Sequence, residues 1–265
     1  DNLSQGHRKA VLGGKLYVGD LRDAEFLAKV FSENDIDGVI HFSASSLVGE
    51  SMQDPAKYYH NNVYGTLCLL EQMHKAGVKR IVFSSTAATY GEPERTPIDE
   101  FDRTLPTNTY GETKLSMERM IRWFDVAHGI KYVSLRYFNA AGAHESGMIG
   151  EDHSPETHLV PLVLQVALGQ RPHISVFGDD YPTVDGTCVR DYIHVSDLAD
   201  AHVLALERLR NGGESGIFNL GSGNGFTVKQ VIDVARQVTG RDIPAKIEPR
   251  RAGDPATLVA SSTRA

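Results

Sequence analysis

The sequence predicts an α/β fold in which helices cover a mainly parallel sheet. Residues 39–42, 80–85 and 132–138 are short runs rich in β-branched or aromatic side chains, which is typical of buried strands. Amphipathic helical patterns alternate with these runs through the first half of the chain. This alternation indicates a parallel sheet, because a chain that re-enters a sheet in the same direction needs a crossover, usually a helix.

The helices of the first half are expected at residues 24–33, from Asp54-Pro55 onward, and at residues 110–128. Asp54 can cap the second helix, and Pro55 suits its first helical position. After Gly142 the alternation weakens, so we place a domain boundary there, between residues 1–142 and a smaller α/β region, 143–265, with some segments returning to the main sheet. In this region we expect helices at 159–168, 195–210 and 227–238, strands at 217–220 and 245–248, and a long loop at 179–190.

Composition excludes several classes of function. With 265 residues, 41% of them hydrophobic, the chain can bury a sizeable core. A net charge of −7 and the absence of a long Lys/Arg run argue against a nucleic-acid partner. No apolar run approaches the roughly 18 to 20 residues of a membrane span, so we expect no membrane association. Cys68 and Cys188 are too few and too separated for a disulfide framework or a thiolate metal site, so we expect a cytoplasmic protein and predict no metal site.

Tyr110 and Lys114 lie four residues apart on a predicted helix and project from the same face. A tyrosine loses its proton near pH ~10, and a nearby cation shifts this toward neutral pH, where the phenolate serves as a base. Ser84, Ser85 and Thr86 stand at the carboxyl end of a predicted strand, where ligands of open α/β sheets bind. By itself, Tyr-x-x-x-Lys also fits an aromatic ring packed under a solvated lysine, so its context decides its meaning.

In that context the strand-end hydroxyls and the Tyr-x-x-x-Lys of residues 110–114 resemble the catalytic signature of the short-chain dehydrogenase/reductases, with the spacing of the extended branch. Further segments resemble the UDP-glucose 4-epimerases of that branch, in order and spacing, over essentially the whole chain: HFSA at 41–44, YYHNNV at 58–63, YG at 90–91, RYFN at 136–139, GDDY at 178–181 and VRDYIHV at 189–195. The resemblance implies a Rossmann-type doubly wound sheet that binds NAD over residues 1–142, and a mainly UDP-sugar-binding region over residues 143–265.

The implied reaction interconverts UDP-galactose and UDP-glucose by transient oxidation at carbon 4 with bound NAD. Tyr110 would remove the proton of the 4-hydroxyl, and Thr86 would hydrogen-bond the same hydroxyl. Lys114 would act as the electrostatic partner of Tyr110 and hold the nicotinamide ribose, and the nicotinamide cation would also favour the phenolate. Because NAD ends unchanged, the cofactor is expected to stay bound through the cycle.

The resemblance also implies the residues that bind the UDP-sugar, namely Thr86, Asn139, His158, Leu159, Phe177, Arg190, Arg251, Asp254 and Leu258. Arginine suits a pyrophosphate because its forked donors bind two oxygens. His158 stands where an amide is expected, although both groups can donate to a uracil or phosphate oxygen. The bulk of Leu258 in the hexose pocket favours UDP-glucose and UDP-galactose over N-acetylated sugars.

The implied cofactor-binding residues are Asp1, Asn2, Asp20, Leu21, Phe42, Ser43, Ala44, Ser46, Asn61, Ser84, Tyr110, Lys114 and Phe138. An acid at Asp1 fits the adenosine ribose hydroxyls and disfavours the extra phosphate of NADP. Ser46 departs from the lysine that some family members carry, although the Ser-Leu-Val-Gly form is also familiar.

One expected element lies outside the sequence. A Gly-x-x-Gly-x-x-Gly turn, with its strand and helix, should precede the ribose-binding acid by about 20 residues, and Gly221 to Gly225 come too late and lack this spacing. The chain also stops short of the tail that such enzymes usually carry. We therefore expect a fragment of a longer gene product, inactive by itself.

Two other functions remain open. A related epimerase or 4,6-dehydratase would share the fold, but the dehydratase needs an acidic pair beside the strand-end hydroxyl, and Thr86 is followed by Ala87 and Ala88. A non-catalytic nucleotide-sugar-binding protein would not need Thr86, Tyr110 and Lys114 together. The resemblance further implies a homodimer packed through helices near residues 61–73 and 112–124.

Overall fold

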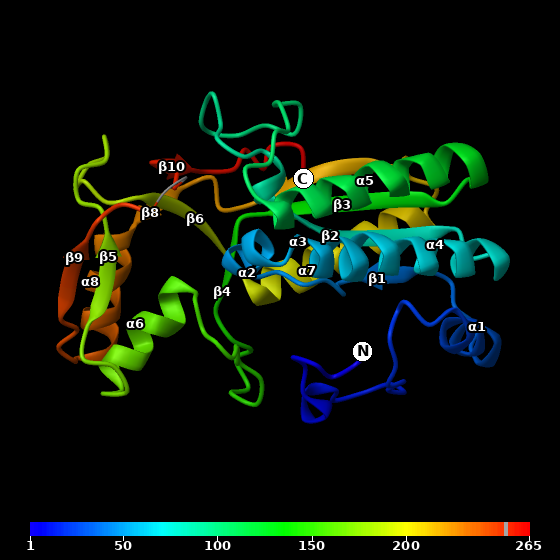
Figure 1. The fold of residues 1–265 in the computed structure, drawn as a ribbon, viewed down its shortest axis with the longest axis horizontal. Coiled ribbons are helices and arrows are strands. Elements are labelled where there is room, and N and C mark those ends of the chain that lie inside the picture. The colour runs from blue at the N-terminus through cyan, green and yellow to red at the C-terminus, as the bar shows by residue number, and fades with distance from the viewer. Residues whose placement is uncertain (252–253) are drawn as a thin grey trace. The chain divides into compact units, whose positions relative to one another are not determined.

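The computed structural model describes residues 1–251 and 254–265 and confirms the predicted α/β class (Figure 1). The chain forms two compact units. Unit 1 comprises residues 1–91, 100–137 and 198–219, and unit 2 comprises residues 92–99, 138–197 and 220–265. Each unit is assembled from separate segments of the chain, and the functional boundary at residue 142 stays a prediction.

Unit 1 is built on a four-stranded sheet in the order β1-β2-β3-β7. The strands are β1 (Val39–His41), β2 (Arg80–Thr86), β3 (Lys131–Tyr137) and β7 (Gly216–Leu220). The pairs β1–β2 and β2–β3 are parallel, as predicted. The helices are α1 (Ala24–Glu33), α2 (Val48–Gln53), α3 (Pro55–Tyr58), α4 (Gly65–Lys75), α5 (Thr109–His128) and most of α7 (Val195–Arg210), and a π-helical turn at Tyr59–Tyr64 joins α3 to α4.

The core of unit 1 lies between the sheet and the helices α4 and α5, which run along it in Figure 1. Ile81 and Phe83 alternate on β2 and therefore face the same side, where Leu70 and Met73 of α4 and Met117 of α5 pack against them. All five side chains are fully buried. Burying a side chain of this size contributes about 1.5–3 kcal/mol, so this packing holds α5 on the sheet.

Local signals set the two ends of α5. The Asn108 side chain caps its start by accepting from the Gly111 N–H at 2.8 Å, and Gly129 ends it in the left-handed conformation with φ 66°. A glycine is required at position 111, because a Cβ there would lie 2.5 Å from the Ala88 carbonyl oxygen. This close approach brings the first turn of α5 against the end of β2, and with it Tyr110 beside Thr86.

Unit 2 contains two smaller sheets. The first has the order β10-β6-β4, with β8 antiparallel to β6, and consists of β4 (Asn139–Ala141), β6 (Val189–His194), β8 (Gly225–Thr227) and β10 (Thr257–Leu258). The second pairs β5 (Ile174–Phe177) with β9 (Ala245–Glu248) in parallel, and α6 (Leu159–Ala167) and α8 (Val228–Thr239) share a core with it. In the described residues, no helix is long and apolar enough to cross a membrane.

Most of the sequence-based elements agree with the structure, but the helix α2 and the strands β4, β5, β6, β8 and β10 were not predicted. The loop expected through residue 190 ends earlier, because β6 begins at Val189. Its Asp191 is fully buried and accepts backbone N–H bonds from Ser222, Gly223 and Ala260. A strand stabilised by a buried carboxylate does not show the apolar alternation on which the prediction depends.

Candidate active site

Three hydroxyl side chains end β2 and are all buried: Ser84, Ser85 and Thr86. The Ser84 hydroxyl lies 2.5 Å from the hydroxyl of Tyr137 on the neighbouring strand β3. The Thr86 hydroxyl accepts the Ala88 N–H at 3.2 Å and forms a hydrogen bond with the Tyr110 phenol. Because successive strand residues point to opposite faces, Ser85 faces α5 and donates to Glu118, whereas Ser84 points to the other face of the sheet. All three residues lie at the ligand-binding edge of the sheet.

Lys114 lies one turn further along α5 than Tyr110 and is buried, with 3% of its surface exposed. Its Nζ donates to the Ser84 carbonyl oxygen at 2.7 Å and lies 6.0 Å from the centre of the Tyr110 ring. The structure thus brings together all three residues that the sequence predicts to be catalytic. An ammonium has three donors, so two remain for a ligand hydroxyl.

Burial has the largest effect on the pKa values of Lys114 and Tyr110. It lowers the pKa of Lys114 to about 7, although the carboxylate of Glu118 partly opposes the shift. Burial also raises the pKa of Tyr110, the neighbouring Tyr137 raises it further, and the hydrogen bond to Thr86 partly opposes the rise. In the protein alone, burial disfavours the charged forms of both side chains, because both lose hydration. The expectation that Lys114 and the nicotinamide cation together favour the phenolate stays a prediction.

The lowered pKa of Lys114 predicts that the stability of the fold depends on pH. Between about pH 7 and about pH 10, the unfolded chain holds a Lys114 proton that the folded chain has released, so the free energy of unfolding rises with pH across this window. In Lys114→Met this rise should be weaker by about 1 kcal/mol per pH unit, measured by urea unfolding of the cofactor-free protein. The exposed Lys75→Met provides the control and should follow the wild type. Identical profiles for wild type and Lys114→Met would show that Lys114 remains charged in the fold.

Buried polar side chains that the sequence did not single out hold the start of α5. Ser51, fully buried in α2, accepts the Tyr110 N–H at 3.1 Å. Asn62 is also fully buried, and its side-chain amide donates to the Thr113 hydroxyl at 3.0 Å. The same amide accepts the Ser45 N–H at 2.7 Å and donates to the Ser45 carbonyl oxygen at 3.0 Å. In the sequence, such residues can be recognised as polar side chains at positions that the helical pattern places in the interior.

The residues predicted at the adenosine end of the cofactor gather at the start of unit 1. Asn2 donates to the Asp20 carboxylate at 3.3 Å, and the Gly19 N–H donates to the Asp1 carbonyl oxygen at 3.1 Å. Asp20 also accepts from Arg22 at 2.7 and 2.8 Å, which is the main reason why its pKa lies far below the usual range. Leu21 follows Asp20 and packs at the edge of the unit 1 core.

The loop after β1 carries the next predicted cofactor residues. Phe42 has 58% of its surface exposed and one ring face against His202, at 4.6 Å between ring centres. Ser43 and Ser46 are exposed, Ala44 is partly buried, and Asn61 donates to Ser45 at 3.1 Å. Phe138, the last predicted residue, directly follows β3.

Unit 2 carries eight of the nine residues predicted to bind the UDP-sugar, and five of these eight lie in two groups. Arg190 on β6 donates to the carbonyl oxygens of Val189 and Pro255 at 2.9 Å and lies 3.6 Å from the Asp254 carboxylate. Leu258 pairs with Arg190 in the strand register. In a second group, the Arg251 guanidinium stacks 3.9 Å above the ring of Phe177.

Three further predicted residues of unit 2 stand apart from these pairs. Asn139 on β4 donates to the Asp191 carbonyl oxygen at 2.8 Å. His158 and Leu159 stand at the start of α6, with the His158 Nδ1 atom 2.8 Å from the Glu156 carboxylate. That contact belongs to a four-residue cluster that the sequence reasoning missed.

A parallel sheet with strand-end hydroxyls, facing a helix that carries a tyrosine and a buried lysine one turn apart, defines a nucleotide-dependent site of the dehydrogenase type. The model of the family described as "NAD dependent epimerase/dehydratase family" matches residues 1–221. The chain belongs to this family.

Individual proteins that resemble the chain belong to a narrower group than this family, the UDP-glucose 4-epimerases. A UDP-glucose 4-epimerase of Halalkalibacterium halodurans is 62% identical over all of this chain and 79% of its own length. The crystal structure of the UDP-glucose 4-epimerase from Brucella ovis, in complex with NAD, aligns with a TM-score of 0.98 at 48% identity, over 100% of this chain and 81% of its own. That of Bifidobacterium longum, in complex with NAD⁺ and UDP, aligns with a TM-score of 0.91 at 43% identity, over 100% and 82% of the two chains.

Proposed function

We propose that this protein is an isomerase that interconverts UDP-galactose and UDP-glucose with bound NAD, that is, a UDP-glucose 4-epimerase. The observation that carries the proposal is the Tyr110 phenol, hydrogen-bonded to Thr86 and one turn from the buried Lys114. Similarity at 62% identity over the full chain supports the choice of substrate.

Each side chain of the site has a separate role in proton transfer. The Tyr110 phenolate takes the proton of the sugar 4-hydroxyl, and the resulting phenol returns it after inversion. Thr86 hydrogen-bonds the same hydroxyl and orients it toward Tyr110. Lys114 is held by the Ser84 carbonyl oxygen, and its charge state controls the acidity of the neighbouring phenol.

The residues of unit 1 fit NAD. Lys114 makes one hydrogen bond to the part of the chain that the structure describes, which leaves donors for the nicotinamide ribose. Phe42 offers an exposed aromatic face at the carboxyl end of β1, and Asn2 and Asp20 provide polar groups for the adenosine end. When bound, NAD⁺ would supply the acceptor for the hydride of carbon 4 and, once reduced, the donor that returns this hydride.

The nucleotide part of the UDP-sugar is assigned to residues of unit 2. Arg190 and Arg251 bind the pyrophosphate through their forked donors. Asn139, His158, Leu159, Phe177 and Asp254 hold the nucleotide. Leu258 limits the space beside the hexose and favours UDP-glucose and UDP-galactose over N-acetylated sugars. Strong binding of the nucleotide with few contacts to the hexose lets the sugar turn between the two half-reactions.

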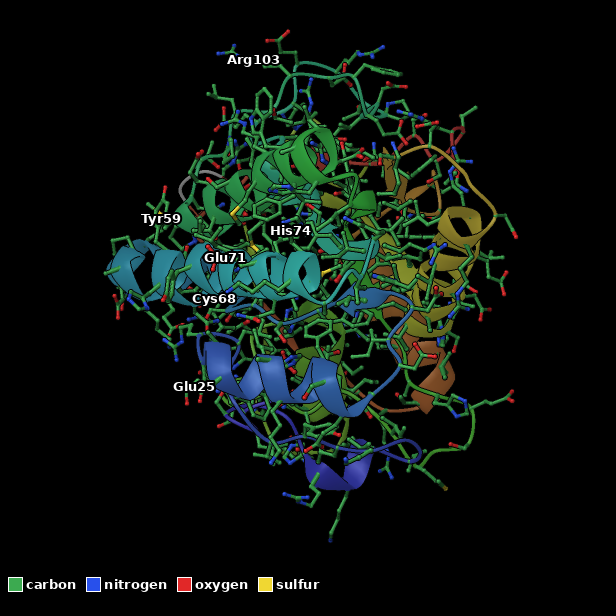
Figure 2. The ribbon with its side chains drawn as sticks, turned by 90° about the vertical axis from the view of Figure 1, so that its right-hand side faces the viewer. Glu25, Tyr59, Cys68, Glu71, His74 and Arg103 are labelled. Carbon is green, nitrogen blue, oxygen red and sulfur yellow. The ribbon has the colours of Figure 1, made fainter. Side chains whose placement is uncertain are left out.

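A homodimer formed through α4 and α5 completes the proposal. Trp123 and Val126 lie three residues apart on α5 and expose 66% and 68% of their surfaces, and Tyr64 exposes 46% just before α4. Figure 2 shows α4 with Cys68, Glu71 and His74 labelled. Sedimentation equilibrium should give twice the chain mass, and a monomer at all concentrations would rule out the dimer. The two buried free cysteines, Cys68 and Cys188, support a cytoplasmic location.

The test of this function is conversion of UDP-galactose to UDP-glucose by the full gene product that carries this chain, with no NAD added. We expect turnover, because the cofactor stays bound through the cycle. No conversion, even with NAD supplied and the fold intact by circular dichroism, would overturn the assignment.

A further inference from the structure

Four metal-ligating side chains converge in the segment that leads into α6: Glu151, His153, Glu156 and His158. One nitrogen or oxygen atom from each lies within 4.8 Å of those of the other three. Glu151, His153 and Glu156 have no role in the proposed reaction. The cluster spans eight residues of sequence in the pattern Glu-x-His-x-x-Glu-x-His.

The separations within the cluster match a metal-binding geometry. His158 Nδ1 lies 3.0 Å from Glu151 and 2.8 Å from Glu156, and His153 Nδ1 lies 3.2 Å and 3.4 Å from the same two carboxylates. Zinc bonds of about 2.0–2.1 Å in a tetrahedron place neighbouring ligand atoms roughly 3.3 Å apart. The four separations, which involve both oxygens of Glu156, lie between 2.8 and 3.4 Å, so shifts of a few tenths of an ångström bring these atoms to the zinc spacing.

We propose that these four residues bind one divalent transition-metal ion, with zinc as the preferred ion. Two imidazole nitrogens and two carboxylate oxygens suit zinc better than magnesium or calcium, which prefer oxygen ligands alone. With both histidines neutral, the two carboxylates balance the charge of the cation. Four protein ligands leave no open position, so the site is structural and not catalytic.

The surroundings of Glu156 support a built site. Only 6% of its side chain is exposed, and one of its oxygens also accepts the N–H groups of Thr157 and His158, both at 2.7 Å. Such bonds fix the orientation of a ligating carboxylate. The two histidine side chains are 40% and 50% exposed, which leaves a path for the ion.

The metal would also define the chemistry of His158. With Nδ1 on the ion, the ring proton is confined to Nε2, which becomes a fixed N–H donor at the start of α6. An amide at this position would offer the same kind of donor. This consequence rests on the proposed function, whereas metal binding itself does not.

Metal content tests the site directly. The full gene product, prepared without a polyhistidine tag and stripped with a chelator, is titrated with Zn²⁺ in competition with a chromophoric chelator. We expect one tight site per chain, and His153→Ala should weaken it by at least about 10- to 100-fold. The matched control is His144→Ala, since His144 bonds to Ser146 at 2.8 Å outside the cluster, and its affinity should equal the wild type.

Cobalt substitution tests the geometry, and Glu151→Gln is the second variant if His153→Ala fails to fold. Co²⁺ should give the strong visible absorption of a tetrahedral site, lost in His153→Ala and Glu151→Gln but kept in His144→Ala. Fewer than one zinc per chain, equal affinities in the two histidine variants, or the weak spectrum of octahedral cobalt would overturn the proposal. None of these measurements depends on turnover, so they fail or succeed independently of the epimerase assignment.

Discussion

Replacement of Tyr110 by phenylalanine is expected to lower the turnover of UDP-galactose by roughly 10²- to 10⁴-fold, the usual contribution of a positioned acid or base. The change removes one hydroxyl and keeps the ring. The backbone N–H of Tyr110 still donates to Ser51, so the first turn of α5 stays in place. The loss should therefore fall on kcat, with little change in KM or in the melting temperature.

Tyr90→Phe is the matched control for Tyr110→Phe. It also removes a phenol hydroxyl from unit 1, one that donates to Asn219 at 2.7 Å and has no part in the proposed reaction. Its turnover should stay within a few-fold of the wild type. Comparable losses in both variants would mean that the site tolerates no lost hydroxyl and that Tyr110 has no special role.

The largest stability effect is expected for Glu118→Leu. Glu118 on α5 binds the Arg136 guanidinium through both carboxylate oxygens, one of them at 2.9 Å, and also accepts from Ser85. Both charged side chains are 3% exposed. Removing the carboxylate leaves a buried guanidinium unpaired, so we expect the free energy of unfolding to fall by about 3–5 kcal/mol in denaturant titrations.

The double variant Glu118→Leu with Arg136→Met separates charge burial from simple loss of contacts. Because it leaves no unpaired charge, it should recover most of the lost stability. If the double variant is less stable than Glu118→Leu alone, the pair itself stabilises the fold, and the explanation from an unpaired charge is wrong.

The sequence predicted the parallel sheet and α5 because their signals are local. Apolar runs define β2 and β3, and Asn108 and Gly129 bound the helix that carries Tyr110 and Lys114. The positions of these two residues follow from helix geometry alone. The sequence pattern did not predict that both side chains are buried, which is the main cause of their shifted pKa values. This burial depends on segments that are distant in sequence.

The missed features depend on contacts between distant residues or on side-chain rotamers. Glu118 stands two turns after Tyr110 on the same helix face, but its partner Arg136 is reached only through the pairing of β2 with β3. The short strands β4 and β10 span three and two residues, too few to show a period. The Glu and His residues before α6 are visible as a pattern, yet only the folded loop turns them toward a common point.

In the proposed reaction, one site removes and returns the same hydrogen at carbon 4 of a UDP-hexose. The most direct test supplies the full gene product with UDP-galactose deuterated at carbon 4 in ordinary water and examines the product by NMR. The product should be UDP-glucose that keeps the deuterium at carbon 4. Loss of the label to solvent, or inversion at another carbon, would contradict it.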